Sequence, residues 1–234
     1  MTLPKLETNR YSVVVPSTQK TIEFRPFLVR EEKLLMVAQE SEDTSQMLKV
    51  LCDIIEVCTF NSLKGKDLTI YDLEYIFLQL RSKSVGETTE VSLKCKECGH
   101  DNVVDIDLSK IDVRFPDKAP SNKLQLNDDV GITLRSITVG KTIEIAKIQD
   151  ENEGFIASIA ACIETIYDKE SVYLTDDSSQ KELHEFIGSL SHSHLGEIQE
   201  FITNQPVLNQ EINYKCASCG HESTYVLEGL MSFF

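Results

Sequence analysis

The sequence lacks any run of apolar residues approaching the roughly 18 needed to cross a membrane. Its first ten residues, MTLPKLETNR, also lack the apolar core of a secretory signal. Basic residues are outnumbered, because 23 lysines and arginines stand against 38 aspartates and glutamates, for a net charge of −15. We therefore expect a soluble cytoplasmic protein, and nucleic-acid binding is disfavoured because no basic patch interrupts the acidic excess.

Signatures of catalysis are missing as well. The segment VGKT at 139–142 ends like a phosphate-binding loop, but Arg135 stands where that loop requires a glycine. Acidic pairs such as Asp128–Asp129 lack the spacing of a calcium loop. Serine, histidine and carboxylate residues form no recognisable catalytic pattern. The sequence therefore predicts neither enzymatic activity nor a small-molecule substrate.

The first half of the chain shows a clear succession of extended and helical segments. Two β-rich runs, 11–15 and 21–27, predict a hairpin. Apolar spacing predicts helices at 29–40, 45–60 and 69–84. In the last of these, Thr69 is the expected N-cap and Asp72 the acid of the first turn. This helix is apolar on most sides, which favours burial in its own domain over cover by a partner.

The middle of the chain predicts a mostly helical region. Residues 115–129 are expected to form a loop and residues 130–140 a strand. Helical spacing of apolar residues then predicts helices at 153–168 and 179–190. Ser193 is the expected cap of a further short helix that ends before Pro206.

One short phrase occurs twice, as LKCKECGH at 93–100 and as YKCASCGH at 214–221. In each copy two cysteines are separated by two residues and followed by a glycine, between segments that alternate like strands. This spacing lets both thiolates reach one ion about 2.3 Å away, and the glycine suits a tight turn at positive φ. We call residues 95–100 the first knuckle and residues 216–221 the second knuckle.

Two such knuckles supply a complete tetrahedral site for one structural Zn²⁺. The predicted ligands are Cys95, Cys98, Cys216 and Cys219. The long spacer is compatible with this site, because the entropy of loop closure grows only logarithmically with length. A redox dithiol is the less favoured alternative, since a matched pair of motifs favours a metal.

The other cysteines and the histidines are not expected to bind metal. Cys52, Cys58 and Cys162 fall in apolar helical patterns and are expected to pack in the core. His100 and His221 follow knuckles that are already complete, so a polar role beyond the site is favoured over ligation. The SHSH segment, with His192 and His194, is interpreted as a helix cap rather than a second metal site.

Together these segments predict an α+β fold. An N-terminal hairpin and helical region occupies 1–86, and a discontinuous zinc ribbon occupies 87–110 and 207–229. A mostly helical insertion, 111–206, separates the halves of the ribbon. The apolar tail 230–234 is expected to dock on its own domain or, as the second choice, on another protein.

The N-terminal part resembles a known family. Its hairpin contains FRPF, its acidic helix REEKLL, and LEYIFLQLRSKSVGE precedes the first knuckle. These features are similar to the baseplate hub assembly family of contractile-tailed phages of the T-even type, over residues 20–105. The resemblance implies a non-enzymatic role in the infected bacterial cytoplasm, as an assembly chaperone or as a hub component retained in the particle. Its implied partners are other phage baseplate hub proteins.

Two apolar segments supply weak candidates for partner-binding residues, although burial in the chain's own domain is favoured for both segments. These candidates are Leu73, Tyr75, Phe77 and Arg81 of the family-like segment and Leu230, Met231, Phe233 and Phe234 of the tail. The alternative function is a zinc-ribbon module that binds nucleic acid or acts in transcription. Such modules carry basic stripes and stacking aromatic residues, and the acidic surroundings of both knuckles disfavour this alternative.

Overall fold

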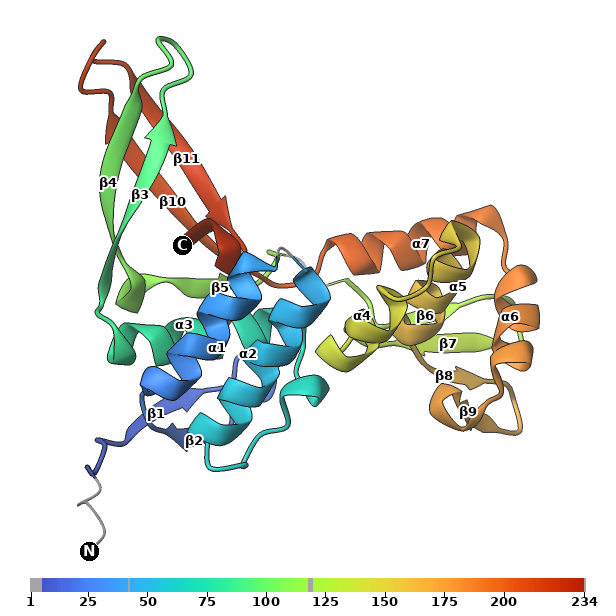
Figure 1. Cartoon of the computed structure of the whole chain (residues 1–234). Coiled ribbons are helices and arrows are strands. Elements are labelled where there is room, and N and C mark those ends of the chain that lie inside the picture. Colours follow the sequence, from blue (N-terminus) through green and yellow to red (C-terminus); the bar gives the residue numbers. More distant parts are fainter. Residues whose placement is uncertain (1–5, 42, 118–119, 234) are drawn as a thin grey trace, which may run out of the picture. The chain divides into compact units, whose positions relative to one another are not determined.

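Contacts between residues divide the chain into two units, shown in Figure 1. The structure is a computed structural model that describes residues 6–41, 43–117 and 120–233, with the backbone alone for residue 231. Unit 1 runs to Arg114 and resumes at Val207, and unit 2 spans Phe115–Pro206. Unit 2 is therefore an insertion into unit 1 along the chain.

Unit 1 begins with the predicted hairpin and three helices. The hairpin pairs β1 (Tyr11–Val14) with β2 (Thr21–Phe24), and the helices are α1 (Val29–Glu40), α2 (Thr44–Cys58) and α3 (Ile70–Ser84). Asp43 caps α2 by accepting the amides of Ser45 and Gln46. The apolar stripe of α2, which includes Leu51, Ile54 and Ile55, is buried. These elements confirm the local predictions for residues 11–84.

Helix α3 is the central element of unit 1. It contacts α2 on one side and, on others, the strands β5 (Asp112–Arg114) and β10 (Val207–Lys215). Thr69 caps it as predicted, because its side chain accepts the Asp72 amide. The Asp72 carboxylate is buried and accepts the Ser17 amide at 2.9 Å and the Thr69 hydroxyl at 2.8 Å. The acid of the first turn therefore also fastens the β1–β2 turn to α3.

A buried ion pair joins the end of β2 to α1. Arg25 and Glu31, both below one-tenth exposed, meet at 3.0 Å. Glu31 also accepts the Leu28 amide at 2.7 Å and Arg30 Nε at 2.6 Å. Burial acts to raise the pKa of Glu31, but the hydrogen bonds from Arg30, Arg25 and Leu28 lower it below its ordinary value. One carboxylate thus compensates a buried guanidinium and caps a helix.

Two further hairpins carry the knuckles. β3 (Thr88–Lys94) pairs with β4 (Asp101–Asp107), and β10 pairs with β11 (Glu222–Glu228). β10 also pairs with β5, in a three-stranded sheet of order β11-β10-β5. The β3–β4 hairpin forms a separate two-stranded sheet. The tips of the two hairpins lie at the same end of unit 1 (Figure 1).

The apolar C-terminal segment docks on unit 1. Its short 3₁₀ helix η4 (Leu230–Phe233) contacts α3 and β11, and Leu230 and Phe233 are buried. The Leu230 amide donates to the Glu74 carboxylate of α3 at 3.1 Å. The favoured prediction, docking of the tail on its own domain, is thus confirmed for these two residues. Phe234 and the side chain of Met231 lie outside the described part of the chain.

Unit 2 packs helices on an antiparallel sheet with the order β6-β7-β8-β9. Its strands are β6 (Lys123–Gln125), β7 (Gly131–Leu134), β8 (Ile163–Tyr167) and β9 (Val172–Leu174). Its helices are α4 (Val139–Ile145), α5 (Glu151–Cys162), α6 (Gln180–Gly188) and α7 (His192–Thr203). Ile132, Ile163 and Ile198 are fully buried members of its core, which strands and helices share.

Unit 2 corrects three local predictions. The helix expected at 153–168 ends at Cys162, because the β-branched run from Ile163 adopts extended backbone and joins the sheet as β8. The loop expected at 115–129 contains β6. The cap of the last helix is Ser191 rather than Ser193. The insertion therefore contains a four-stranded sheet in addition to its helices.

The point of insertion differs from the predicted one by a few residues. Residues 111–114, expected to begin the insertion, lie in unit 1 because β5 pairs with β10. In that ladder Arg114 stands opposite Val207, so the chain leaves unit 1 and re-enters it at paired positions.

In the described part of the chain, no helix is both long and apolar enough to span a membrane.

The Arg25–Glu31 pair gives a first prediction. Glu31→Gln keeps an acceptor for the Leu28 amide but leaves the buried Arg25 charge uncompensated. We expect it to lower the free energy of unfolding of unit 1 by about 3–5 kcal/mol. Native-state hydrogen exchange of α2 and α3 amides measures this change. The matched control is Glu23→Gln, which breaks the exposed Arg10–Glu23 pair and should cost less than about 0.5 kcal/mol.

The same pair has a defined pH dependence. A carboxylate whose pKa is lowered by folding stabilises the protein above its unfolded pKa, and this contribution is lost as the pH falls through the folded pKa. The stability difference between wild type and Glu31→Gln should therefore be constant near neutrality and shrink below about pH 4. A difference that is small at neutral pH, or that grows in acid, would contradict this account.

Candidate metal centre

The two knuckles adopt the same turn. In the first, the Cys95 amide donates to the His100 carbonyl at 2.8 Å and the Gly99 amide to the Cys95 carbonyl at 3.0 Å. In the second, the Cys216 and Gly220 amides make the equivalent bonds at 2.8 and 2.9 Å. Gly99 and Gly220 have φ values of 72° and 73°, which a residue with a Cβ adopts only at a cost. The repeated sequence therefore encodes a repeated backbone.

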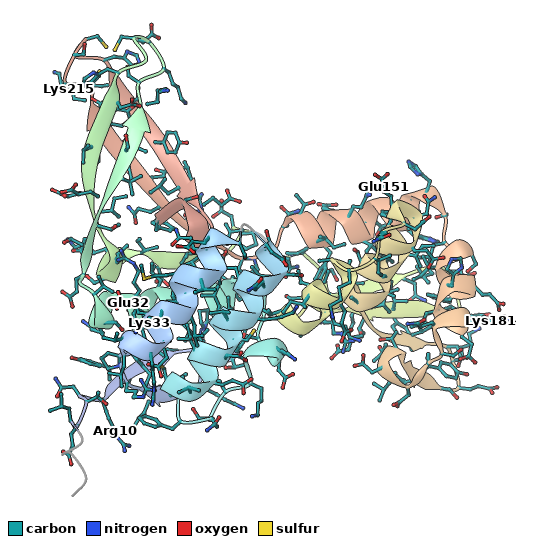
Figure 2. All side chains as sticks on the ribbon, in the orientation of Figure 1. Arg10, Glu32, Lys33, Glu151, Lys181 and Lys215 are labelled. Atoms are coloured by element: carbon teal, nitrogen blue, oxygen red, sulfur yellow. The ribbon has the colours of Figure 1, made fainter. Side chains whose placement is uncertain are left out.

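The four predicted cysteine ligands come together at the tips of the two hairpins. Figure 2 draws yellow sulfur atoms at this end of unit 1, where Lys215 is labelled. The sulfur atoms of the four cysteines all lie within 4.8 Å of one another. Cys95 Sγ is 3.7 Å from Cys219 Sγ, and Cys98 Sγ is 3.6 Å from Cys216 Sγ. Four bonds of about 2.3 Å to a tetrahedral ion would give sulfur–sulfur edges of about 3.8 Å. The observed spacing fits a tetrahedral four-thiolate site.

The electrostatics of the cluster also fit a cation. The backbone amides of Cys219 and Ser218, together with the Cys98 thiol, lower the pKa of Cys216 to about 6. The His221 amide acts in the same direction on Cys219, but hydrogen bonds with neighbouring sulfurs and burial raise the pKa of that thiol to about 12. Thiols this close cannot all ionise unless a cation compensates their charge. Sulfur ligands suit a soft divalent ion.

Few other polar contacts join the two hairpins. The Tyr214 hydroxyl of β10 donates to the Lys94 carbonyl of β3 at 3.3 Å. The side chain of Asn102, from β4, accepts the Ala217 amide of the second knuckle at 2.9 Å. The hairpins belong to different sheets, so no backbone ladder connects them. The sulfur cluster is therefore a principal connection at this end of unit 1.

The three remaining cysteines are buried, as the sequence predicts for residues that pack in the core. Cys52, Cys58 and Cys162 are at most 1% exposed, and burial raises the pKa of each thiol to about 11. His194 lies in the cap of α7, where its Nδ1 accepts the Ser191 amide at 3.3 Å. Among the described residues, the potential metal-binding cluster consists of the four knuckle cysteines, without His100 or His221.

The structure places most of the candidate partner-binding residues inside unit 1. Leu73, Phe77, Leu230 and Phe233 are buried, and Tyr75 and Arg81 are partly buried. Phe77, Arg81 and Leu230 nevertheless border one groove of about 230 Å³ between α1, α2, α3 and η4. Sequence reasoning did not identify this groove, because much of its wall comes from other helices, including Met36 of α1 and Met47 of α2.

Exposed apolar side chains concentrate on α1. Val29, Met36 and Val37 are 66%, 59% and 60% exposed, whereas Ala38 is the apolar residue of this helix that is fully buried. The sequence signal for this surface was weak, because apolar and charged residues are mixed all around α1. Scattered apolar residues on a surface are common, but a helix that buries so little of its apolar area offers a contact surface.

Unit 2 contains a larger cavity, of about 530 Å³, between α4, α5 and α6. Arg135 at its rim makes two hydrogen bonds to Asp176, at 2.7 and 2.8 Å. Asp176 raises the pKa of Arg135, and Arg135 lowers the pKa of Asp176. Each group therefore stabilises the charged form of the other, which suits an ion pair and not a general acid or base.

These observations define an α+β protein of two units, with a four-cysteine cluster at the paired tips of two hairpins. A family model described as "T4 bacteriophage base plate protein" matches residues 8–234, and the chain belongs to this family. The chain is 27% identical over 225 residues to "Baseplate hub assembly protein gp26" of Enterobacteria phage T4. That match covers 96% of this chain and 97% of the relative. No solved structure matches the chain.

The knuckle glycines give a second prediction. A Cβ at Gly99 would meet nothing within 4 Å, and one at Gly220 only the end of the Lys215 side chain. Alanine at either position therefore causes no steric clash, but its Cβ disfavours the positive φ of the turn. We expect each substitution to destabilise the hairpin tip by about 1 kcal/mol. Native-state hydrogen exchange of the β3–β4 and β10–β11 amides measures the effect, which should be equal in the two variants.

The matched control is the same substitution in a helix. Gly154 lies in α5 with open space around its Cα, so Gly154→Ala should stabilise unit 2 by about 0.5–1 kcal/mol. Equal and neutral effects at all three glycines would contradict the role assigned to the turn geometry.

Proposed function

We propose that this protein acts through protein–protein contacts in the assembly of the central hub of a phage tail baseplate, either as a chaperone or as a hub component. The observation that carries the proposal is the similarity, along nearly the whole chain, to a relative named as a baseplate hub assembly protein. Because the match includes both units, the role of the relative is a reasonable guide to the role of the entire chain.

The properties of the site support a non-enzymatic role. A tetrahedral ion held by four thiolates has no position left for water or substrate, so such a site is structural. At the unit 2 cavity, Arg135 and Asp176 each stabilise the charged form of the other, so neither suits a general acid or base. The exposed apolar residues of α1 and the groove beside it suit contact with another protein. The net charge of −15 disfavours a nucleic-acid partner.

The proposal includes the place of action and the partners. The protein would act in the cytoplasm of the infected bacterial host, on other baseplate hub proteins. A chaperone leaves the complex before the particle is finished, whereas a hub component stays in the baseplate.

Co-purification from infected cells tests this function. A tagged copy of the protein should recover hub proteins of the same phage in stoichiometric amounts, compared with an untagged infection. Mass spectrometry of mature particles then separates the two forms of the proposal, because a hub component is found there and a chaperone is not. Recovery of no hub protein would overturn the proposed function.

We also propose that the four knuckle cysteines hold one structural Zn²⁺. Cys95 and Cys216 are 2% exposed, whereas Cys98 and Cys219 are exposed, so an ion at this site is shielded on one side by the hairpins. Metal binding would contribute directly to the folding free energy of the hairpin tips. The ion would thus replace the backbone ladder that the two hairpins lack.

Zinc content and thiol accessibility give a third prediction. Purified protein should contain one Zn²⁺ per chain, and a chelator should make four thiols reactive while the three buried thiols react only on unfolding. Cys216→Ser should lose the ion, because three thiolates are left at a site built for four. The control Cys162→Ala removes a buried thiol of unit 2 and should retain one ion. Undiminished zinc in Cys216→Ser would refute the shared site.

A further inference from the structure

Hydrogen bonds between backbone groups of the second knuckle hold its turn closed. The Cys216 and Gly220 amides close the turn through backbone carbonyls. The amide of Ala217 differs, because its acceptor comes from the other hairpin.

That acceptor is the side chain of Asn102, which is only 6% exposed. Its Oδ1 accepts the Ala217 amide at 2.9 Å. Its Nδ2 donates to the His100 carbonyl at 3.0 Å and to the Leu93 carbonyl at 3.3 Å. Asn102 therefore binds backbone carbonyls of β3 and of the first knuckle, and it also binds the second knuckle beside Cys216.

The hydrogen bond between Asn102 and the Ala217 amide, which we call the bridge, breaks the local symmetry of the two knuckles. Asn102 stands two residues after His100, and the second knuckle has Ser223 two residues after His221. Cys95 Sγ lies 3.7 Å from Cys219 Sγ and Cys98 Sγ lies 3.6 Å from Cys216 Sγ, as expected for two turns related by a local two-fold axis. A serine side chain is too short to make the three bonds that Asn102 makes. The two turns therefore match in backbone but differ at this position, where the first has the longer asparagine side chain and the second has a serine.

We propose that Asn102 is a positioning residue of the metal centre, which holds the second knuckle against the first so that the four sulfurs converge before an ion binds. This inference rests on the proposed metal site. The hairpins share no backbone ladder, and each supplies only two sulfurs. Without the bridge, an incoming ion would also have to align the hairpins, and this ordering would reduce its affinity.

The expected size of the effect follows from known metal sites. Partners that orient the ligands, without touching the metal, typically change metal affinity 10–100-fold when they are removed. The Tyr214–Lys94 hydrogen bond is a second link between the hairpins, so loss of Asn102 should weaken the alignment without abolishing it. The variant should therefore still bind one ion through four sulfurs, with reduced affinity.

The test substitution is Asn102→Ser, which gives the first knuckle the residue that the second knuckle already carries at the matching position. A serine is thus compatible with this turn, and the substitution removes the bridge. The matched control is Ser223→Ala. Competition between the full-length protein and a chromophoric chelator for Zn²⁺ measures the affinity. We expect a loss of roughly 10–100-fold for Asn102→Ser and less than about twofold for Ser223→Ala.

Hydrogen exchange of α3 amides, measured on the same samples, separates positioning from general stability. We expect protection of α3 to be unchanged in Asn102→Ser, because this helix lies away from the knuckles in unit 1. Equal affinity in wild type and Asn102→Ser would overturn the inference and leave the metal site intact. A loss of affinity accompanied by loss of α3 protection, or an equal loss in Ser223→Ala, would also overturn it. A wild-type protein that takes up no zinc would refute the metal site itself, independently of the co-purification result.

Discussion

The convergence of four sulfur atoms at the tips of two hairpins is the constraint on which the arrangement of this end of unit 1 depends. β3–β4 and β10–β11 are far apart in sequence and belong to different sheets. Asn102 accepts one hydrogen bond across the two hairpins and Tyr214 donates another, but two hydrogen bonds offset little of the entropy lost in ordering two long hairpins. An ion shared by both knuckles would supply the missing free energy. The close approach of four thiols therefore fits a site where a cation would compensate the charge of the thiolates.

This constraint explains how a complete second unit can interrupt the chain between the knuckles. The insertion leaves unit 1 after Arg114 and returns at Val207, which are opposite each other in the β5–β10 ladder. Unit 2 has its own core, shared by its sheet and its helices. The knuckles therefore close over an insertion whose ends are already held together, and the length of the insertion adds little to the entropy of closing the site.

The sequence predicted the site better than it predicted the fold around it. The repeated cysteine spacing and the glycines identified all four sulfurs, because a two-residue spacing and a residue at positive φ are local features. The elements up to residue 84 were also predictable, since their caps and apolar stripes are local. The strand from Ile163 was mistaken for helix, because Ile159, Ile163 and Ile166 are spaced as on one helical face while only tertiary pairing makes the latter two a strand. Asn102 was missed because its partner, Ala217, is 115 residues away and carries no side-chain signal.

The family-like segments of the sequence turn out to serve the fold. FRPF and REEKLL contain Arg25 and Glu31, which form the buried ion pair that joins β2 to α1. The segment LEYIFLQLRSKSVGE forms most of α3, whose side chains Leu73 and Phe77 are buried. A family resemblance carried by such residues reports a shared core and contains little information about the surface that a partner contacts. The proposed recognition of a hub protein would therefore depend on residues that the core does not constrain, and the exposed apolar side chains of α1 are of this kind. The interior and the knuckles of unit 1 fix its shape, and the surface residues that they hold in place would then be free to match a partner.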